Sequence, residues 1–416
     1  MQSISYIDHH AHIYGTGYKV LHPKLDTASS IDEVLNILKP QLQQSNVSWI
    51  TARGWDQNKW AEKQFPTREH LNSLSSDIAI VLIRIDGHAL WCNSKALALS
   101  GIDRNTPIPS GGDILKSASG EPTGIVLDDA MALVYDAMPI EDEVSITNTL
   151  RAGLTEFAKH HIGVHDMGIP AEWWESFKQL YKAKGDSLIN SYVFLDMTKP
   201  TGKKLFLEKI KQEKFDDSTH PNLKLVGIKL YLDGALGSRG AHLFEPYSDD
   251  PGNTGLRLMD DTEALELMSL AASRGLQIAI HAIGDAANAR ALDLIAQTPN
   301  PKPQTQFRIE HAQIIRDEDL NRYKDLNVTA VIQPQFFASD RHWAIDRLGA
   351  DRMKMAYRWR SLFDAGIKVA ASSDSPVEDA DAAIGIKLLQ TRDGVNDGEC
   401  VTKEIAEKWY QSCELD

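Results

Sequence analysis

Residues 277–311, QIAIHAIGDAANARALDLIAQTPNPKPQTQFRIEH, contain the pattern that decides the fold. An apolar run from Gln277 to His281 is followed by a segment of helical periodicity from Ala286 to Ala296 and by a second apolar run from Phe307 to His311. A strand, a helix and another strand in this order make one repeat of a parallel α/β sheet. Both predicted strands end in a histidine, so the strand ends are where we look for chemistry.

The same alternation extends over the rest of the chain. Further buried strands are predicted at Ser5–Asp8, Ile162–Asp166, Ser191–Asp196, Leu225–Leu232, Val328–Gln333 and Lys368–Asp374. Additional helices are predicted at Thr262–Arg274 and Arg352–Ala365. Together with the opening pair, the strands reach the number that closes a (β/α)8 barrel, so we predict an α/β fold of the TIM-barrel type.

One connection is unusually long. About 150 residues separate the first predicted strand from the second, far more than an ordinary βα loop contains. This insert includes strand-like runs at Trp49–Gly54 and Ile78–Ile85 and a Gly/Pro/Ser-rich stretch, NTPIPSGGDILKSASGEPTG. We therefore predict that residues 1–12 supply the first barrel strand, residues 13–150 a cap lobe over the barrel mouth, and residues 151–416 the remaining catalytic barrel.

Composition excludes several kinds of partner. The 416-residue chain is 42% hydrophobic and carries a formal net charge of −14, which argues against nucleic acid or an anionic membrane surface. No apolar run approaches the roughly 20 residues of a membrane span, and the N-terminus does not resemble a signal peptide. We expect a cytoplasmic enzyme that acts on a small molecule, with a homo-oligomer possible. Its cysteines, Cys92, Cys400 and Cys413, lack CxxC spacing, so nitrogen and oxygen must hold any metal.

Histidines end several of the predicted strands. His10 and His12 are two residues apart at the end of the first strand, and in an extended chain they point the same way, so they could share one ion. His281 and His311 end the fifth and sixth strands. Each histidine taken alone is as well explained by an incidental or hydrogen-bonded core role.

Lys229 and Asp374 complete the pattern. Lys229 lies inside the apolar run of the fourth strand, where a lysine must be paired, shifted in pKa or chemically modified. Asp374 ends the eighth strand, and a helix cap would explain it alone. The order HxH, Lys, His, His, Asp on strands one, four, five, six and eight is improbable as a coincidence. Barrel active sites form at these strand ends, so the pattern predicts a metal site there.

The chain resembles the amidohydrolase superfamily, and within it the amidohydrolase family 3 branch, similar to N-substituted formamide deformylases. The resemblance covers nearly the whole chain. Besides the ligand set, it rests on the stretches YIDHHAHIYGTG, RGWDQNKW, RIDGHALWCNSKAL, GEPTGIVLDDA, GVHDMG, KLYLDGALGSRGA, HAIGDAANARAL, RIEHAQI and SSDSPVE.

The resemblance implies a binuclear metal site, with zinc the expected ion. Under this interpretation His10 and His12 bind the more buried ion, His281 and His311 bind the more exposed one, and an N6-carboxylated Lys229 bridges the two. Asp374 would ligate the first ion and handle protons. The implied reaction is hydrolysis of an amide-type C–N bond, in an N-acyl or N-formyl amine, by a metal-activated hydroxide.

The resemblance is incomplete at both ends of the chain. Family members usually carry a small β-sandwich before the HxH strand and after the last barrel strand, and that sandwich is largely missing here, so we expect a truncated chain. The family pattern also has a glutamate near Asp128 and Asp129 in GEPTGIVLDDA, so we assign that segment no catalytic role.

Predicted substrate contacts come from both regions. The insert offers Trp55 and His88, and the barrel loops offer Tyr231, Arg239 and Arg358. His88 follows a predicted strand that could aim it at the metals, so it is our candidate for polarising the substrate carbonyl. A histidine tied to Asp86 within the cap explains the same sequence equally well.

Other functions fit parts of the pattern. The same barrel site could serve an esterase, a lactonase or a ring deaminase. A mononuclear deaminase would lack the modified lysine, so Lys229 favours the binuclear reading. An inactive truncated homologue is a further alternative. A metal-free barrel enzyme using Lys229 as a Schiff base would leave four histidines unexplained.

Overall fold

The computed structural model describes residues 6–43, 48–61, 63–139, 141–183, 188–212, 214–299, 301–411 and 415. The chain divides into two compact units. The first unit comprises Met1–Gly17 and Glu143–Asp416, and the second comprises Tyr18–Asp142. Each unit has its own hydrophobic core.

The first unit is built on an eight-stranded sheet whose strands follow the chain order. The strands are β1 Ile7–Ala11, β7 Gly163–Ile169, β8 Asn190–Asp196, β9 Leu223–Tyr231, β10 Gln277–Ala282, β11 Gln306–His311, β12 Thr329–Ile332 and β13 Lys368–Ala371. All paired neighbours are parallel. Backbone bonds from Asp374 N to His10 O and from His12 N to Ser375 O, both 2.8 Å, join the two ends of the sheet. The predicted (β/α)8 barrel is thereby confirmed.

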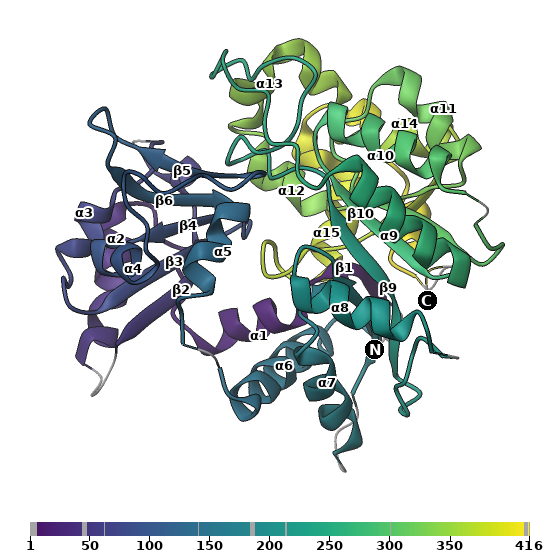
Figure 1. The fold of residues 1–416 in the computed structure, drawn as a ribbon. Helices are drawn as coiled ribbons and strands as arrows, with labels where there is room; N and C mark the ends of the chain where they lie inside the picture. Colours follow the sequence, from purple (N-terminus) through teal and green to yellow (C-terminus); the bar gives the residue numbers. More distant parts are fainter. Residues whose placement is uncertain are drawn as a thin grey trace. The chain divides into compact units, whose positions relative to one another are not determined.

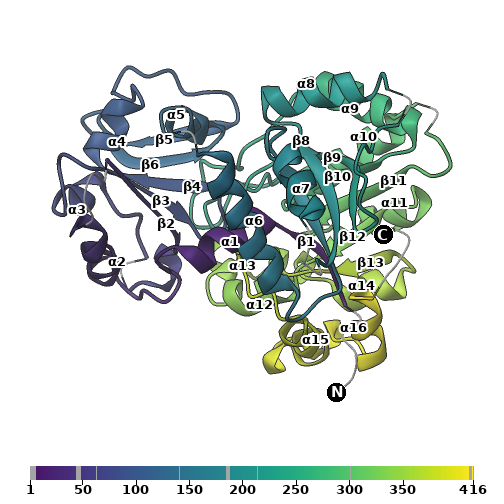
Figure 2. The same cartoon turned by 90° about the horizontal axis from the view of Figure 1, so that it is seen from below.

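Helices cover the barrel strands from outside. The main helices of the first unit are α1 Ile13–Leu21, which continues into the second unit, α6 Glu143–Phe157, α7 Trp173–Lys182, α8 Pro200–Lys209, α9 Asp261–Arg274, α10 Asp285–Gln297, α11 Asp317–Asp325, α12 Pro334–Asp340, α13 Ala344–Arg352, α14 Trp359–Asp364, α15 Ala382–Thr391 and α16 Lys403–Trp409. Figures 1 and 2 show α9 beside β9 and β10. The α9 helix starts at an Asp260 side-chain cap and ends at Gly275, whose φ of 73° suits glycine. The predicted helices at Thr262–Arg274 and Ala286–Ala296 are confirmed as α9 and α10.

The predicted continuous helix Arg352–Ala365 is wrong. The chain there leaves α13, forms a short 3-10 turn at Met353–Met355, and bridges from Ala356 to Ile314 before α14 begins. Two backbone bonds hold the break, Ile315 N to Met355 O at 2.9 Å and Tyr357 N to Gln313 O at 2.8 Å. Pairing with the segment after β11 therefore overrides the local helical periodicity.

The second unit contains a five-stranded mixed sheet in the order β2-β3-β4-β6-β5. Its strands are β2 Trp49–Trp55, β3 Ala79–Arg84, β4 Ala89–Cys92, β5 Gly112–Lys116 and β6 Pro122–Asp128, and its helices include α2 Ile31–Leu38, α3 Arg68–Asn72, α4 Ser94–Leu99 and α5 Ala132–Tyr135. The two strands predicted in the insert correspond to β2 and β3. The remaining strands were not predicted, because β4 is very short and β5 and β6 lie in or next to the Gly/Pro/Ser-rich stretch.

Within the described residues, none of the helices combines the length and the apolar character that crossing a bilayer requires.

Candidate metal centre

Three of the predicted ligands converge at the carboxyl ends of the barrel strands. One ligand atom each from His10, His311 and Asp374 lies within 4.8 Å of the others, and all three residues are buried. His10 belongs to β1, His311 ends β11, and Asp374 follows β13. Strand ends that are far apart in sequence thus meet at one edge of the barrel, as the fold requires.

A buried hydrogen bond to a carboxylate orients His10. Its Nδ1 lies 2.5 Å from Glu310 Oε2, and Glu310 Oε1 accepts a hydrogen bond of 2.5 Å from the fully buried Arg308. Because the carboxylate can only accept, His10 Nδ1 carries the proton and Nε2 presents a lone pair. That Nε2 lies 3.4 Å from Asp374 Oδ1. A carboxylate behind a histidine ligand is a common way to fix its ring.

His12 lies on the other side of the same carboxylate. Its Nε2 is 3.2 Å from Asp374 Oδ1, and its side chain is about one-third exposed. The spacing in HxH therefore brings both imidazoles to Asp374.

His281 and His311 form a second pair. His311 Nδ1 lies 2.8 Å from Gln333 Oε1, so it donates and leaves Nε2 as a lone pair directed at His281 Nδ1, 3.0 Å away. His281 Nε2 lies 3.4 Å from Asp233 Oδ1. The Asp233 carboxylate is held by backbone amides of His242, Ile283 and Gly284.

This donor set fits divalent metal. The lone pair of His10 Nε2 faces a carboxylate oxygen that is buried and has no hydrogen-bond partner among the described residues. At the second pair, His281 Nδ1 donates to His311 Nε2 at 3.0 Å, and His281 Nε2 lies 3.4 Å from Asp233 Oδ1. A cation bound between the His10 lone pair and the Asp374 oxygen would stabilise both. Nitrogen and oxygen ligands suit zinc and related ions.

The protonation states agree with that chemistry. Burial lowers the pKa of His311 to about 4 and holds the pKa of His10 well below its usual range, so both imidazoles are neutral at pH 7. Burial alone would raise the pKa of Asp374, but the facing His10 and His12 hold it well below its ordinary value. Neutral imidazole and ionised carboxylate are the forms that bind metal.

Lys229 is buried in β9, as its sequence position suggested. Burial lowers the pKa of Lys229 to about 8, while the nearby Glu310 and Asp374 carboxylates act in the opposite direction. The ammonium nitrogen lies 4.9 Å from the centre of the Tyr231 ring. Gly168, at φ 100°, lies against Lys229 and Tyr231, because a Cβ there would stand 3.2 Å from Tyr231 Oη and 3.4 Å from Lys229 Cγ. A substantial neutral fraction at mildly alkaline pH is what reaction with CO2 needs.

The three substrate contacts predicted on the barrel, Tyr231, Arg239 and Arg358, have different surroundings. The half-buried Tyr231 lies beside His281, with ring centres 5.5 Å apart. Arg239 is paired with Asp249, with 2.9 Å between Nη2 and Oδ2, and Arg358 is paired with Asp317 at 2.7 Å. Of these three residues, Tyr231 is the one that contacts a predicted metal ligand among the described residues.

The predicted insert contacts lie in the second unit. Trp55 is fully buried, packs against Trp60 and Trp91, and donates its indole N–H to Leu82 O at 2.9 Å. This core position gives no support to a substrate-binding role. His88 is 18% exposed, and its Nδ1 lies 2.6 Å from Asp128 Oδ1.

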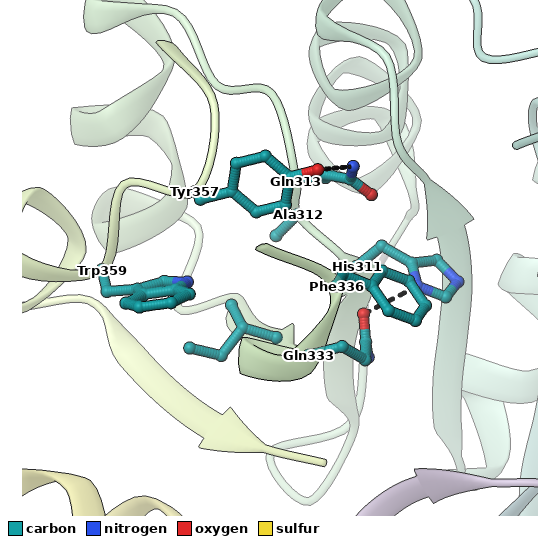
Figure 3. Close-up of a pocket in the computed structure, with 8 residues that line it drawn as sticks. His311, Ala312, Gln313, Gln333, Phe336, Tyr357 and Trp359 are labelled. Carbon is teal, nitrogen blue, oxygen red and sulfur yellow. Dashed lines mark hydrogen bonds between the residues drawn. The ribbon is translucent and has the colours of Figure 1, made fainter. Parts of the chain in front are cut away.

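A small hollow adjoins His311 (Figure 3). Its volume is about 210 Å³ including its open mouth, and its lining consists of His311, Ala312, Gln313, Ile332, Gln333, Phe336, Tyr357 and Trp359. The Phe336 ring stacks nearly parallel to the His311 ring, with centres 5.9 Å apart. Gln313 donates to Tyr357 Oη at 2.7 Å. The hollow therefore offers aromatic faces and amides next to a predicted metal ligand.

The residues that face the candidate ligands could not be predicted from the sequence. Glu310, Asp233 and Gln333 each face a histidine of the site. The available signal was a polar residue inside or just after an apolar strand, as in FRIEH, LYLDG and VIQPQ. That signal marks a buried polar group but does not identify its partner.

The sequence and the fold of this chain are similar to those of known proteins. The profile of the amidohydrolase family matches residues 6–415. The protein YtcJ of Bacillus subtilis (strain 168) is 34% identical over 423 residues, covering 97% of this chain and 77% of that protein. An N-substituted formamide deformylase of Arthrobacter pascens is 25% identical, covering 84% and 65%. The crystal structure of an uncharacterized metal-dependent hydrolase from Pyrococcus furiosus has a TM-score of 0.72 at 30% identity, covering 98% of this chain and 80% of that one.

Proposed function

Since this chain belongs to the amidohydrolase family, we propose that it hydrolyses an amide-type C–N bond of an N-acyl or N-formyl amine. The observation that carries the proposal is the convergence of His10, His311 and Asp374, whose possible ligand atoms lie within 4.8 Å of one another at the carboxyl ends of the barrel strands. The similarity to an N-substituted formamide deformylase supports the bond type. We also propose that residues 13–150 form a cap lobe that supplies substrate contacts.

We assign two zinc ions to the site. His10, His12 and Asp374 would hold the first, His281 and His311 the second, and N6-carboxylated Lys229 would bridge them. Divalent ions bound there would activate water and polarise the substrate carbonyl. Glu310 and Gln333 accept hydrogen bonds from Nδ1 of His10 and His311 and so leave Nε2 of each ring available to a metal.

The protein's own groups handle protons and orientation. Asp374, ionised and buried, accepts a proton at its carboxylate and returns it to the leaving nitrogen. Tyr231 packs beside His281 and can restrict the substrate on that side. His88 supplies a polar contact to the scissile amide, and Arg239 and Arg358 remain candidates for binding more distant substrate groups.

Metal stoichiometry tests the proposal first. Elemental analysis of protein purified without chelator should give about two divalent ions per chain for wild type and far fewer for Lys229→Ala. Intact mass measured under CO2 should show one added CO2 on wild type that is absent from the variant. One ion that survives loss of Lys229 would instead indicate a mononuclear, deaminase-like site.

Substrate class requires a separate assay. Wild type should hydrolyse N-formyl and N-acyl amines faster than matched esters, lactones or ring amines. Faster turnover of an ester would assign the site to an esterase. No metal together with no turnover would make an inactive homologue the correct description.

A further inference from the structure

Arg308 is a buried cation in the barrel strand that ends at His311. Arg308 and Glu310 are two residues apart on β11, so their side chains leave the strand on the same face. Both side chains are fully buried. Burying a charged group is costly unless it is paired and hydrogen-bonded. The contacts of this guanidinium group therefore have to account for its position.

The guanidinium group of Arg308 contacts residues of four barrel strands. Within β11, its Nε donates to Glu310 Oε1 at 2.5 Å, and its Nη2 lies 3.3 Å from Glu310 Oε2. Nη2 also donates to the backbone oxygen of His9 in β1, and Nη1 lies 3.0 Å from His165 Nδ1 in β7. The centre of the Phe194 ring, in β8, lies 5.3 Å from Cζ. An arginine held from several directions presents its N–H donors to Glu310 in a fixed geometry.

The two oxygens of Glu310 serve different donors. Oε1 accepts from Arg308 Nε, and Oε2 accepts from His10 Nδ1, each at 2.5 Å. A guanidinium group can only donate, whereas the Nδ1 atom of a neutral imidazole can either donate or accept. Arg308 therefore requires an acceptor at the end of residue 310 that faces it. The chemistry of the other end then decides which nitrogen of His10 carries the proton.

We propose that Arg308 is a positioning residue that sets the direction of the hydrogen bond between residue 310 and His10. With a carboxylate at position 310 both ends accept, so His10 carries its proton on Nδ1 and leaves Nε2 to bind metal. With an amide at position 310, Arg308 retains the oxygen and the NH2 group donates to His10 Nδ1. The proton of His10 then lies on Nε2, which cannot bind metal. This inference rests on the metal site of the proposed function and makes metal binding by His10 depend on Arg308 as well as on Glu310.

Glu310→Gln tests the first half of this inference on the full-length protein. Nitrogen NMR of labelled histidines, after treatment with a chelator, reports which nitrogen of each ring carries the proton, and His10→Asn identifies the His10 signals by their loss. Wild type should show the His10 proton on Nδ1, and Glu310→Gln should show it on Nε2. Competition with a chromophoric chelator should show zinc affinity about 10- to 100-fold lower in Glu310→Gln than in wild type.

Arg308→Met combined with Glu310→Gln tests the role of Arg308 itself. Methionine cannot donate, so the amide oxygen can turn to His10 Nδ1, and removing both charges together leaves neither of them unpaired in the core. The double variant should return the His10 proton to Nδ1 and bind zinc at least about 10-fold more tightly than Glu310→Gln alone. If Arg308 acted only through packing, the double variant would instead bind zinc more weakly than the single variant.

Two further double variants serve as controls. Arg308→Lys with Glu310→Gln keeps a donor at position 308, so the His10 proton should stay on Nε2. Arg347→Met with Glu310→Gln removes another buried arginine of the first unit, one that pairs with Asp249, and should also leave the proton on Nε2. Circular dichroism and urea unfolding identify the variants that are folded.

Two results would overturn the inference. One is a His10 proton that stays on Nδ1 in Glu310→Gln. The other is a proton that stays on Nε2 in the folded double variant Arg308→Met, Glu310→Gln. If wild type binds no zinc, the metal site of the proposed function fails, and the tautomers measured without metal still decide whether Arg308 sets the hydrogen bond at His10.

Discussion

Asp374 has two neighbours that define its role. His10 Nε2 and His12 Nε2 approach the same carboxylate oxygen at 3.4 and 3.2 Å, and these imidazoles hold the pKa of Asp374 well below its usual range. An ionised carboxylate in this position can both contact a cation and accept a proton.

Asp374→Asn should abolish proton transfer by this side chain while keeping its size and shape nearly unchanged. We expect kcat to fall about 10²–10⁴-fold, the usual range for losing a general base, while metal content stays near that of wild type. Steady-state kinetics and elemental analysis on the same preparation measure both quantities. Unchanged kcat would remove Asp374 from the proton pathway.

His161 provides a pH test outside the set of predicted metal ligands. Burial lowers the pKa of His161 to about 4, its Nε2 lies 2.6 Å from Ala380 O, and its buried Nδ1 has no partner among the described residues. The unfolded chain, with a histidine pKa near 6.5, binds this proton first as the pH falls. The neutral side chain therefore contributes fully above about pH 6.5, and the free energy of unfolding falls as the pH drops from there to about 4.

His161→Gln should flatten that pH dependence. The amide can donate to Ala380 O without titrating, so the difference in unfolding free energy between wild type and variant should change by about 3 kcal/mol between pH 7 and pH 4. Urea unfolding at a series of pH values gives this difference. A constant difference across the series would contradict the assignment of a buried neutral His161.

At the scale of elements, β9 and β10 approach closely. Gly227 pairs with Gln277 across these strands, and a Cβ on Gly227 would stand 2.0 Å from the Gln277 carbonyl oxygen. The neighbouring backbone must move to accept any side chain. Lys229 lies two residues further along β9, so a shift in this strand also displaces the proposed bridging residue.

Gly227→Ala should therefore destabilise the protein by about 1–3 kcal/mol or more and lower its metal content. Thermal or urea unfolding and elemental analysis measure the two effects. Gly252→Ala is the control, because nothing lies within 4 Å of the added Cβ there. Equal stability of the two variants would show that the β9–β10 contact relaxes without cost.

The barrel strands could be predicted from local sequence patterns, whereas the break between α13 and α14 could not. A parallel strand is buried on both faces, so its sequence is a nearly continuous apolar run, and all eight runs became strands. Residues 352–365 also show helical periodicity, yet the structure breaks the helix at Ala356 and Tyr357. Bonds to residues 313–315 decide that break, and local periodicity carries no information about them.

For the whole molecule, metal binding should be coupled to stability of the first unit, which contains every predicted ligand. Ligands that bind only the folded state stabilise it by mass action, by about 2.7 kcal/mol at a hundredfold excess over Kd. Removing metal with a chelator should therefore lower Tm, and adding zinc should restore it.

Calorimetry with and without chelator measures this effect. A transition from the second unit, Tyr18–Asp142, should stay in place when metal is removed. Lys229→Ala, which should bind little metal, serves as the control and should show a smaller chelator effect. If the Tm of wild type does not change when chelator is added, metal binding does not stabilise the folded protein.

The barrel, and the histidines and aspartate at its strand ends, follow from the sequence. Buried strands are local apolar runs, and the fold places their carboxyl ends on one edge, so His10, His281, His311 and Asp374 could be predicted together. The contacts that orient these side chains depend on the tertiary structure. His10 and Glu310 are 300 residues apart in the chain, and His88 meets Asp128 only through the pairing of β4 and β6. A hydrogen bond depends on distance and direction in space, which spacing along the chain does not specify.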